Sequence, residues 1–310
     1  MTRARLAAAA TMIFATASGP AFAACDTVRF SDVGWTDITA TTATAQVVLE
    51  ALGYGVDVKL LALPVTFAAL AANDLDVFLG NWMPSMEGDI APYREAGTID
   101  TVRANLEGAK YTLATNAAGA ALGIGDFADI ATHAGALGAT ISGIEPGNDG
   151  NRLILDMIEG NAFGLSGFRV AESSEQGMLA QVARAERRGE PIVFLGWEPH
   201  PMNTNFDLTY LTGGDEWFGP DLGGATIYTN TRAGYVTECP NVGRFLENLV
   251  FTLEMENALM GAILNDNADP QDAARAWLSA NPVTLEGWLD GVTTRNGGDG
   301  LGAVRAALGL

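Results

Sequence analysis

The chain has 310 residues, of which 48% are hydrophobic, and a formal net charge of −20 at pH 7. This composition is typical of a globular protein long enough for two domains, and it excludes a disordered chain. Phosphate binding needs clustered Lys and Arg, which this acidic chain lacks, so we expect no nucleic-acid partner. The negative charge is compatible with a cationic ligand, and equally with a role in solubility alone.

Residues 1–23 have the pattern of a secretory signal peptide. Arg3 and Arg5 precede an apolar stretch over residues 6–17, and Ala21-Phe22-Ala23 forms a small-residue cleavage site. We therefore expect export to the periplasm with cleavage after Ala23. No later apolar run is long enough to cross a membrane, so no direct membrane insertion is expected. A lipoprotein anchored through Cys25 is the weaker alternative, because the phenylalanine three residues before it is atypical.

The first part of the mature chain is predicted to alternate strands and helices. Strands are expected at 28–35, 56–61 and 75–79, with helices at 38–52 and 64–72 between them. Thr36 or Asp37 is expected to cap the first helix, and Gly53 to end it. A β-α-β-α-β order predicts a parallel sheet with right-handed crossovers.

The middle of the chain repeats this pattern, and the end is mainly helical. A helix at 85–96, an extended piece at 99–106 and a strand at 110–114 lead into the second unit. That unit comprises helices at 126–137, 151–159 and 175–188 and strands at 139–144, 168–171 and 192–195. Strands at 208–211 and 225–230 follow, and then helices at 242–253, 257–264, 273–278 and 285–289.

Two cysteines, Cys25 and Cys239, lie far apart without metal-ligand spacing. In an oxidising compartment such a pair predicts a disulfide, which would place the helical tail beside the first unit. One lobe is then expected to combine residues 24–110 and 206–310, and the other to comprise residues 111–205. Crossings near Tyr111 and Asn205 would form a hinge of the kind used by proteins that close around a ligand.

Three motifs place a tryptophan soon after an apolar run and a glycine. The carboxyl ends of strands are where open α/β sheets bind ligands. A single tryptophan in such a place is usually a core residue, and we expect Trp217, Trp277 and Trp288 to be in the core. The threefold recurrence, joined by Tyr111, instead predicts an aromatic box for a quaternary ammonium group. The motifs are Gly34-Trp35-Thr36-Asp37, Gly80-Asn81-Trp82-Met83-Pro84 and Gly196-Trp197-Glu198-Pro199.

Two polar residues are candidates for the rest of the ligand. Asp37 can put a carboxylate beside a bound cation, or it can simply cap the helix that follows. Asn148, close to two glycines at a predicted helix start, can bond a ligand hydroxyl or serve as a turn or cap residue. His200, between two prolines, could be a base or ligand at the pocket rim, but a structural role is favoured.

The sequence supplies no convincing catalytic residue, metal site or cofactor site. It contains only two histidines, and no serine lies in a Gly-x-Ser-x-Gly elbow. Gly123-Ile124-Gly125-Asp126-Phe127-Ala128 matches a dinucleotide pattern but lacks a convincing preceding strand, so we interpret it as a loop and helix cap. The acidic residues at 266–272 lack the EF-hand spacing and are expected to cap a helix. A secreted hydrolase of choline esters or phosphocholine, the alternative function, would need a nucleophile or a metal.

The tryptophan motifs, with Lys110-Tyr111 and Gly147-Asn148-Asp149-Gly150-Asn151, resemble those of the periplasmic substrate-binding proteins of bacterial ABC transporters for quaternary amines. The resemblance covers essentially the whole mature chain and is greatest for choline-binding members. It implies an α/β fold of two lobes, each a mostly parallel sheet flanked by helices, with two crossing strands as the hinge. It also implies these ligand-binding residues: Trp35, Asp37, Trp82, Tyr111, Asn148 and Trp197.

Choline is favoured over glycine betaine by the charges near the motifs. Betaine ends in a carboxylate, which Asp37 would repel, whereas choline ends in a hydroxyl that Asp or Asn can bond. Arg152 and Lys110 are the basic residues near the motifs that could weaken this argument. The expected partners are choline and the membrane permease of an ABC importer, with the protein acting as a monomer. A sensor that presents its ligand to a receptor is a further alternative.

Overall fold

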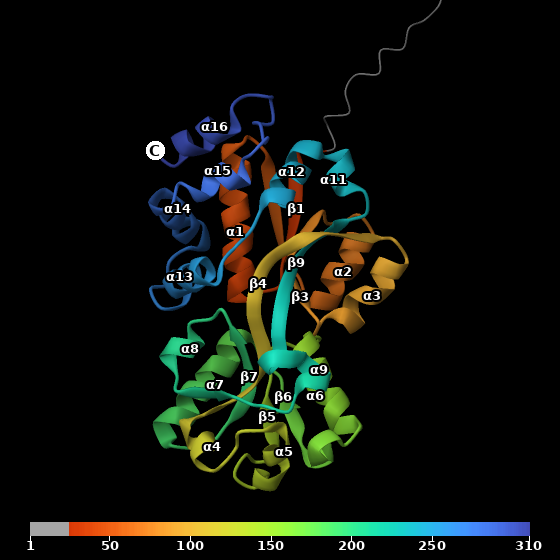
Figure 1. Cartoon of the computed structure of the whole chain (residues 1–310), viewed down its shortest axis with the longest axis vertical. Helices are drawn as coiled ribbons and strands as arrows, with labels where there is room; N and C mark the ends of the chain where they lie inside the picture. Colours follow the sequence, from red (N-terminus) through yellow and green to blue (C-terminus); the bar gives the residue numbers. More distant parts are fainter. Residues whose placement is uncertain (1–24) are drawn as a thin grey trace, which may run out of the picture.

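Two lobes lie one above the other in the computed structural model, which describes residues 25–310 (Figure 1). The predicted signal peptide lies outside the described residues. Two long strands, β4 (Ile99–Asn116) and β9 (Gly224–Arg232), run between the lobes. The predicted two-lobed α/β fold is confirmed.

The first lobe begins with alternating strands and helices, as predicted. Strand β1 pairs in parallel with both β2 and β3, so the crossover helices cover this part of the sheet. Gly34 has φ +84°, a conformation that favours glycine, and it turns the chain from β1 into α1. The elements are β1 (Thr27–Asp32), α1 (Thr36–Ala51), β2 (Gly55–Leu60), α2 (Leu63–Ala71), β3 (Val77–Met83) and α3 (Glu87–Glu95).

The second lobe is built from the middle of the chain. Strands β5, β6 and β7 are parallel to one another. Helix α7 begins at the predicted residue 175, and α6 begins at Asp149, two residues before the predicted start at 151. The strands are β5 (Thr140–Ser142), β6 (Arg169–Ala171), β7 (Val193–Glu198) and β8 (Leu208–Tyr210). The helices are α4 (Ala117–Ala121), α5 (Phe127–Ile130), η2 (Ala131–His133), α6 (Asp149–Glu159), η3 (Ala162–Gly167), α7 (Glu175–Arg188), α8 (Met202–Asn205), α9 (Asp215–Phe218) and α10 (Pro220–Gly223).

Strand β4 joins the two lobes into one sheet with the order β2-β1-β3-β9-β4-β7-β5-β6, and β8 pairs with β4 beside this path. Its first part is antiparallel to β9, and its last part is antiparallel to β7 and β8. The sequence predicted two separate extended pieces here. The break was wrong, because Gly108 and the charged residues around it lie at register irregularities inside one strand.

The C-terminal helices return to the first lobe, where α13 and α14 pack against α1. Most of α1 is buried, and its small Ala and Thr side chains allow helices to approach closely on that side. The elements are α11 (Tyr235–Glu238), α12 (Pro240–Asn248), α13 (Leu253–Leu264), α14 (Pro270–Ala280), α15 (Thr284–Trp288) and α16 (Gly300–Ala307).

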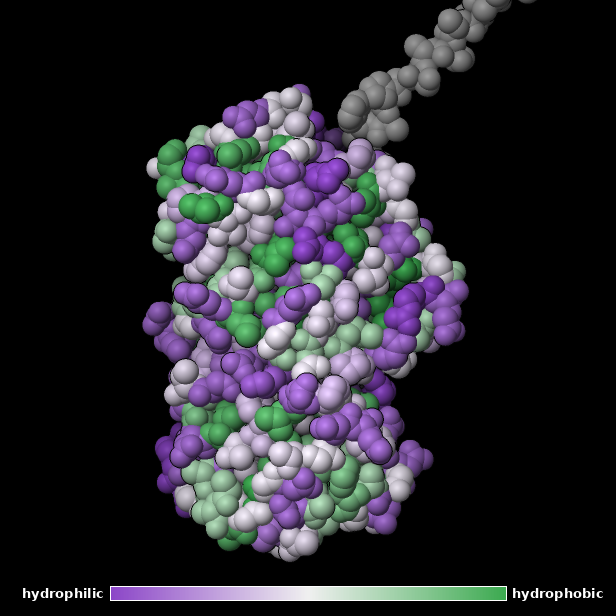
Figure 2. All heavy atoms as spheres, in the orientation of Figure 1, coloured by the Kyte–Doolittle hydropathy of each residue, from purple (hydrophilic) through white to green (hydrophobic). Residues whose placement is uncertain are grey.

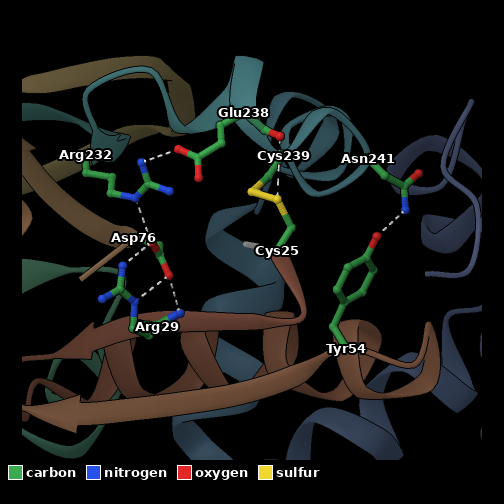
Figure 3. The surroundings of a disulfide bond; sticks show 8 residues. All are labelled: Cys25, Arg29, Tyr54, Asp76, Arg232, Glu238, Cys239 and Asn241. Atoms are coloured by element: carbon green, nitrogen blue, oxygen red, sulfur yellow. Dashed lines mark hydrogen bonds and ion pairs between the residues drawn. A yellow bond between two sulfur atoms is a disulfide. The ribbon is translucent and has the colours of Figure 1, made fainter. Parts of the chain in front are cut away.

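A disulfide between Cys25 and Cys239 ties the start of β1 to the junction of α11 and α12 (Figure 3). The predicted pairing is confirmed, and the sulfur of Cys25 is therefore not free for a lipid. Beside the disulfide, Asp76 accepts hydrogen bonds from the side chains of Arg29 and Arg232. Burial opposes the ionised form of Asp76, but these bonds outweigh it and lower the pKa of this carboxyl.

Several local predictions were wrong. Neither Thr36 nor Asp37 caps α1, because both lie in its first turn and Trp35 occupies the cap position. The helix predicted at 126–137 ends early, since Gly135 and Gly138 follow and the latter has φ +59°.

Polar and apolar residues are mixed over the face shown in Figure 2. Among residues 25–310, no helix combines the length and apolar character needed to cross a membrane.

Candidate functional site

A pocket lies where the two lobes meet on β4. The first lobe supplies residues from the β1–α1 junction and the end of β3, and the second supplies the start of α6 and the end of β7. The lining residues are Trp35, Asp37, Trp82, Met86, Tyr111, Ile144, Asn148, Asp149 and Trp197.

Four aromatic rings wall this pocket. Tyr111 on β4 is the cross-strand partner of Trp197 on β7, with ring centroids 6.3 Å apart. Its ring lies 5.9 Å from that of Trp82, the penultimate residue of β3. Trp35 occupies the cap position of α1. Each ring is at most 6% exposed, so the walls are closed to solvent.

The polar atom of three rings is already bonded to a neighbouring residue. The indole of Trp82 donates to Asp37 at 3.1 Å, and that of Trp35 donates to Glu145 at 2.8 Å. The hydroxyl of Tyr111 donates to the side-chain oxygen of Asn148 at 3.0 Å. These rings therefore present apolar π surface to a ligand, and they are fixed in place by their bonds.

Two buried carboxylates at the pocket each keep one oxygen without a hydrogen-bond partner in the described part of the chain. They are Oδ1 of Asp37 and Oδ2 of Asp149. Burial, and then the charge of Glu175, raises the pKa of Asp37 to about 7. Burial is also the main cause that raises the pKa of Asp149 to about 6. Burial, which disfavours the charged form, is the main cause of both shifts, and the charge of Arg152 lowers the pKa of Asp149 without offsetting it.

Among residues 25–310, no Lys or Arg lines this pocket. Lys110 pairs with Glu198 at 3.1 Å, and Arg152 donates to the carbonyl of Ser85 and to Asp89 on α3. Lys110 and Arg152, the basic residues that could have favoured the carboxylate of betaine, therefore bond to other groups. The pocket itself offers aromatic faces and negative charge, which is the environment that stabilises an organic cation.

Asn148 has both of the roles that the sequence left open. It caps α6, because its side-chain oxygen accepts from the backbone N–H of Asn151, and it also lines the pocket. Its amide nitrogen donates to Asp149 at 3.0 Å. The amide is thereby held with its oxygen toward Tyr111 and its nitrogen toward Asp149.

Gly150, the second residue of α6, leaves room for Tyr111. A Cβ at this position would lie 2.7 Å from Cζ of Tyr111 and 3.0 Å from Leu195. A residue larger than glycine would therefore collide with the tyrosine that forms the hinge side of the pocket.

Comparison with known proteins places this two-lobed chain in a family. A model of the substrate binding domain of ABC-type glycine betaine transport systems matches residues 26–280. The chain belongs to this family.

Solved structures and a curated relative agree with that membership. An ABC-transporter choline binding protein in complex with choline is 69% identical, with a TM-score of 0.91 over 92% of this chain and 99% of that one. A structure of an ABC-transporter choline binding protein in an unliganded semi-closed conformation is also 69% identical, with a TM-score of 0.86 over 93% and 100%. The glycine betaine/carnitine transport binding protein GbuC of Listeria monocytogenes is 30% identical over 158 residues, which is 51% of each chain.

As a substrate-binding protein of an ABC transport system, the chain is a transport component and not an enzyme. Substrate-binding proteins of this family are extracytoplasmic. Within residues 25–310, no three His, Cys, Asp or Glu side chains gather as metal ligands would. Asp126 caps α5 and Asp269 caps α14, which confirms the interpretation of both segments as helix caps.

The substrate-binding protein brings all six predicted ligand residues to one pocket. Of the other tryptophans, Trp288 is buried, while Trp217 and Trp277 are only partly buried against the core. Three lining residues were missed. Asp149 lies inside the motif Gly147-Asn148-Asp149-Gly150-Asn151, so its position was a signal, whereas Met86 and Ile144 are apolar residues that no pattern distinguishes.

Proposed function

We propose that this protein binds choline between its lobes and delivers it to the permease of a bacterial ABC importer. The observation that carries the proposal is one closed pocket in which four aromatic rings meet two carboxylates with unpaired oxygens. A trimethylammonium group has no N–H to donate, so ring faces and nearby negative charge are what can hold it. The solved choline complex at 69% identity supports this ligand.

The polar end of the pocket favours a hydroxyl over a carboxylate. The unpaired oxygens of Asp37 and Asp149 can accept a hydrogen bond from the hydroxyl of choline. Glycine betaine would bring a third carboxylate to the two that are already buried there, where repulsion is poorly screened. We infer that Trp35, Trp82, Tyr111 and Trp197 surround the cation and that Asp37 and Asn148 serve the hydroxyl end.

We place the mature protein in the periplasm as a monomer, after removal of residues 1–23. Family membership supports a permease partner, because the matched domain is the binding component of an ABC transport system. The disulfide supports an oxidising compartment.

Isothermal titration calorimetry with choline, glycine betaine and proline tests the proposal. We expect choline to bind at least about tenfold more tightly than betaine, a difference of about 1.4 kcal/mol, and proline not to bind. Absence of choline binding at millimolar concentration would refute the proposed ligand. Tighter binding of betaine than of choline would contradict the role given to the two carboxylates.

A further inference from the structure

Glu175 makes a buried contact from one lobe to the other. It is the first residue of α7 in the second lobe, and its carboxylate accepts from Thr36, the first residue of α1 in the first lobe. The backbone N–H of Thr36 donates to Oε2 at 2.8 Å, and the hydroxyl of Thr36 donates to Oε1 at 2.5 Å. Glu175 is 1% exposed and Thr36 is 3% exposed, so water does not reach this contact.

Helix α1 depends on this contact because it has no side-chain cap of its own. Trp35 occupies the cap position and makes no side-chain cap hydrogen bond. The first N–H groups of a helix need acceptors, and the helix dipole favours a negative charge there. The carboxylate of Glu175 supplies both, although it lies 139 residues further along the chain.

His200 holds the other side of the same carboxylate. Its Nδ1 accepts the backbone N–H of Met202 at 2.9 Å, so its proton is on Nε2. Nε2 lies 3.2 Å from Oε1 of Glu175 and donates to it. The imidazole also lies edge-on to Trp197, with ring centroids 4.9 Å apart. His200 therefore links Glu175 to a wall of the pocket.

We propose that Glu175 is a positioning residue that latches the closed lobes and sets how slowly the ligand leaves. It does not line the pocket, but both ends of its hydrogen-bond network adjoin the walls. Thr36 lies between Trp35 and Asp37, and His200 contacts Trp197. Opening the lobes breaks both bonds from Thr36, so the closed form retains the ligand for as long as the latch holds.

Other hydrogen bonds also cross between the lobes, but none isolates closure from ligand contact as cleanly. The bond from Asn205 to Asn265 is exposed. Trp35 donates to Glu145, yet its ring is itself part of the pocket. Arg152 donates to Asp89, yet its side chain is 34% exposed, and exposed ion pairs contribute little. Charge-assisted bonds to a buried carboxylate are stronger, which makes Glu175 the decisive position.

The proposal is tested with two substitutions that remove the latch and two that retain it. In Glu175→Gln, an amide N–H replaces one carboxylate oxygen and faces an N–H donor of Thr36 or His200. Thr36→Val removes the hydroxyl and keeps the shape, whereas Thr36→Ser restores the hydroxyl. Glu159→Gln, on the exposed end of α6, is the matched surface control.

Stopped-flow tryptophan fluorescence gives association and dissociation rates for each variant. Because bonds to a charged group are lost, we expect Glu175→Gln to speed choline dissociation about ten- to a hundredfold with an association rate within about twofold of wild type. Thr36→Val loses one bond and should speed dissociation about two- to tenfold. Thr36→Ser and Glu159→Gln should behave as wild type, and the double variant Thr36→Val/Glu175→Gln should be no faster than Glu175→Gln.

The ligand in this test rests on the proposed function, so the same rates are measured with glycine betaine. If the wild-type protein binds betaine but not choline, choline is refuted as the ligand, and the proposed role of Glu175 is not affected. Equal dissociation rates for wild type and Glu175→Gln, with whichever ligand binds, overturn the latch. If Glu175→Gln does not fold, the comparison of Thr36→Val with Thr36→Ser decides, and equal rates for that pair overturn the proposal.

Discussion

Trp82 connects two parts of the pocket through one side chain. Its ring packs against Tyr111, and its indole N–H donates to Asp37. We predict that Trp82→Ala weakens choline binding at least about tenfold, since each ring of a dry aromatic cage contributes about 2 kcal/mol or more and the bond to Asp37 is lost as well. Calorimetric titration with choline measures the change.

Trp288 is the control for that prediction. It is buried at the end of α15, where it packs against Phe251 and donates to the carbonyl of Val250, away from the pocket. Trp288→Ala should lower the thermal unfolding temperature and leave the affinity of the folded protein for choline unchanged. Equal losses of affinity in the two variants would contradict the division of the tryptophans into ligand and core residues.

We predict that Asp37 makes choline binding dependent on pH. Burial and the charge of Glu175 raise its pKa to about 7, and a bound cation favours the ionised form. Protonation of Asp37 must therefore oppose binding, so affinity should fall as the pH is lowered from 8 to 5, and binding near pH 7 should release protons. Titrations in buffers of different ionisation enthalpy measure that release.

The comparison variant is Asp37→Asn, which keeps the shape of the side chain and cannot ionise. It should bind choline more weakly at pH 8 and show a smaller change of affinity between pH 8 and 5. The remaining change of affinity with pH comes from Asp149 and Glu145. Burial raises the pKa of Asp149 to about 6 and that of Glu145 to about 7. A wild-type affinity that is constant over this range would refute the prediction.

Single functional residues could be predicted from the sequence where their neighbours in the sequence form an unusual pattern. Residues without such a pattern could not be predicted. The three tryptophans could be predicted because an apolar run and a glycine precede each of them in the sequence. Glu175 carried no such signal, because an acidic residue at a helix start is ordinary and its partner Thr36 lies in another lobe. The cap expected from Thr36 or Asp37 was wrong for the same reason, since the acceptor comes from a distant segment.

Helix α6 is positioned by the space that Gly150 leaves. We predict that Gly150→Ala displaces Tyr111 or the start of α6, because the new Cβ would lie 2.7 Å from Cζ of the tyrosine. Choline affinity should fall about tenfold or more, as one wall of the pocket moves. Calorimetry and circular dichroism together measure the loss and show that the helices persist.

Gly261, inside α13, provides the matched control. A Cβ there meets no atom within 4 Å, so Gly261→Ala should leave affinity unchanged and stabilise the helix by about 1 kcal/mol. If Gly150→Ala also binds choline as wild type does, the tyrosine tolerates the methyl group and the packing argument fails.

Elements with a strong hydrophobic pattern were predictable, and those shaped by distant partners were not. Helix α7 was predicted at its observed bounds, and in the structure Ser174 caps its start and Gly189 ends it. Helix α16 was missed, since it begins in the glycine-rich segment 297–302. The continuous pairing of β4 could not be deduced, because its neighbours β7 and β9 come from much later in the chain.

For the whole molecule, the disulfide closes a loop between residues 214 positions apart. We predict that Cys25→Ala/Cys239→Ala lowers the free energy of unfolding by roughly 3–5 kcal/mol, since the unfolded chain regains the entropy that the bond removes. Urea unfolding measures the loss. Because neither cysteine lines the pocket, choline affinity of the folded variant should match that of wild type.

The lobe boundaries, residues 24–110, 111–205 and 206–310, stay a prediction. Strand β8 pairs with β4 at Ala114–Asn116, whereas β9 begins opposite Lys110. This pairing favours a second crossing near residue 223, later than the predicted position near residue 205. The helical tail could be assigned to the first lobe from sequence only because the disulfide was predicted.

Strand β4 is hydrogen-bonded along its length to partners in both lobes, with no loop at the point where the lobes meet. Movement of one lobe relative to the other therefore has to bend and twist a continuous sheet. The register irregularities between Thr101 and Ala109 are where the ladder already departs from regular pairing. Deformation of this backbone pairing is therefore a second source of resistance to opening, separate from the side-chain contact of Glu175 with Thr36.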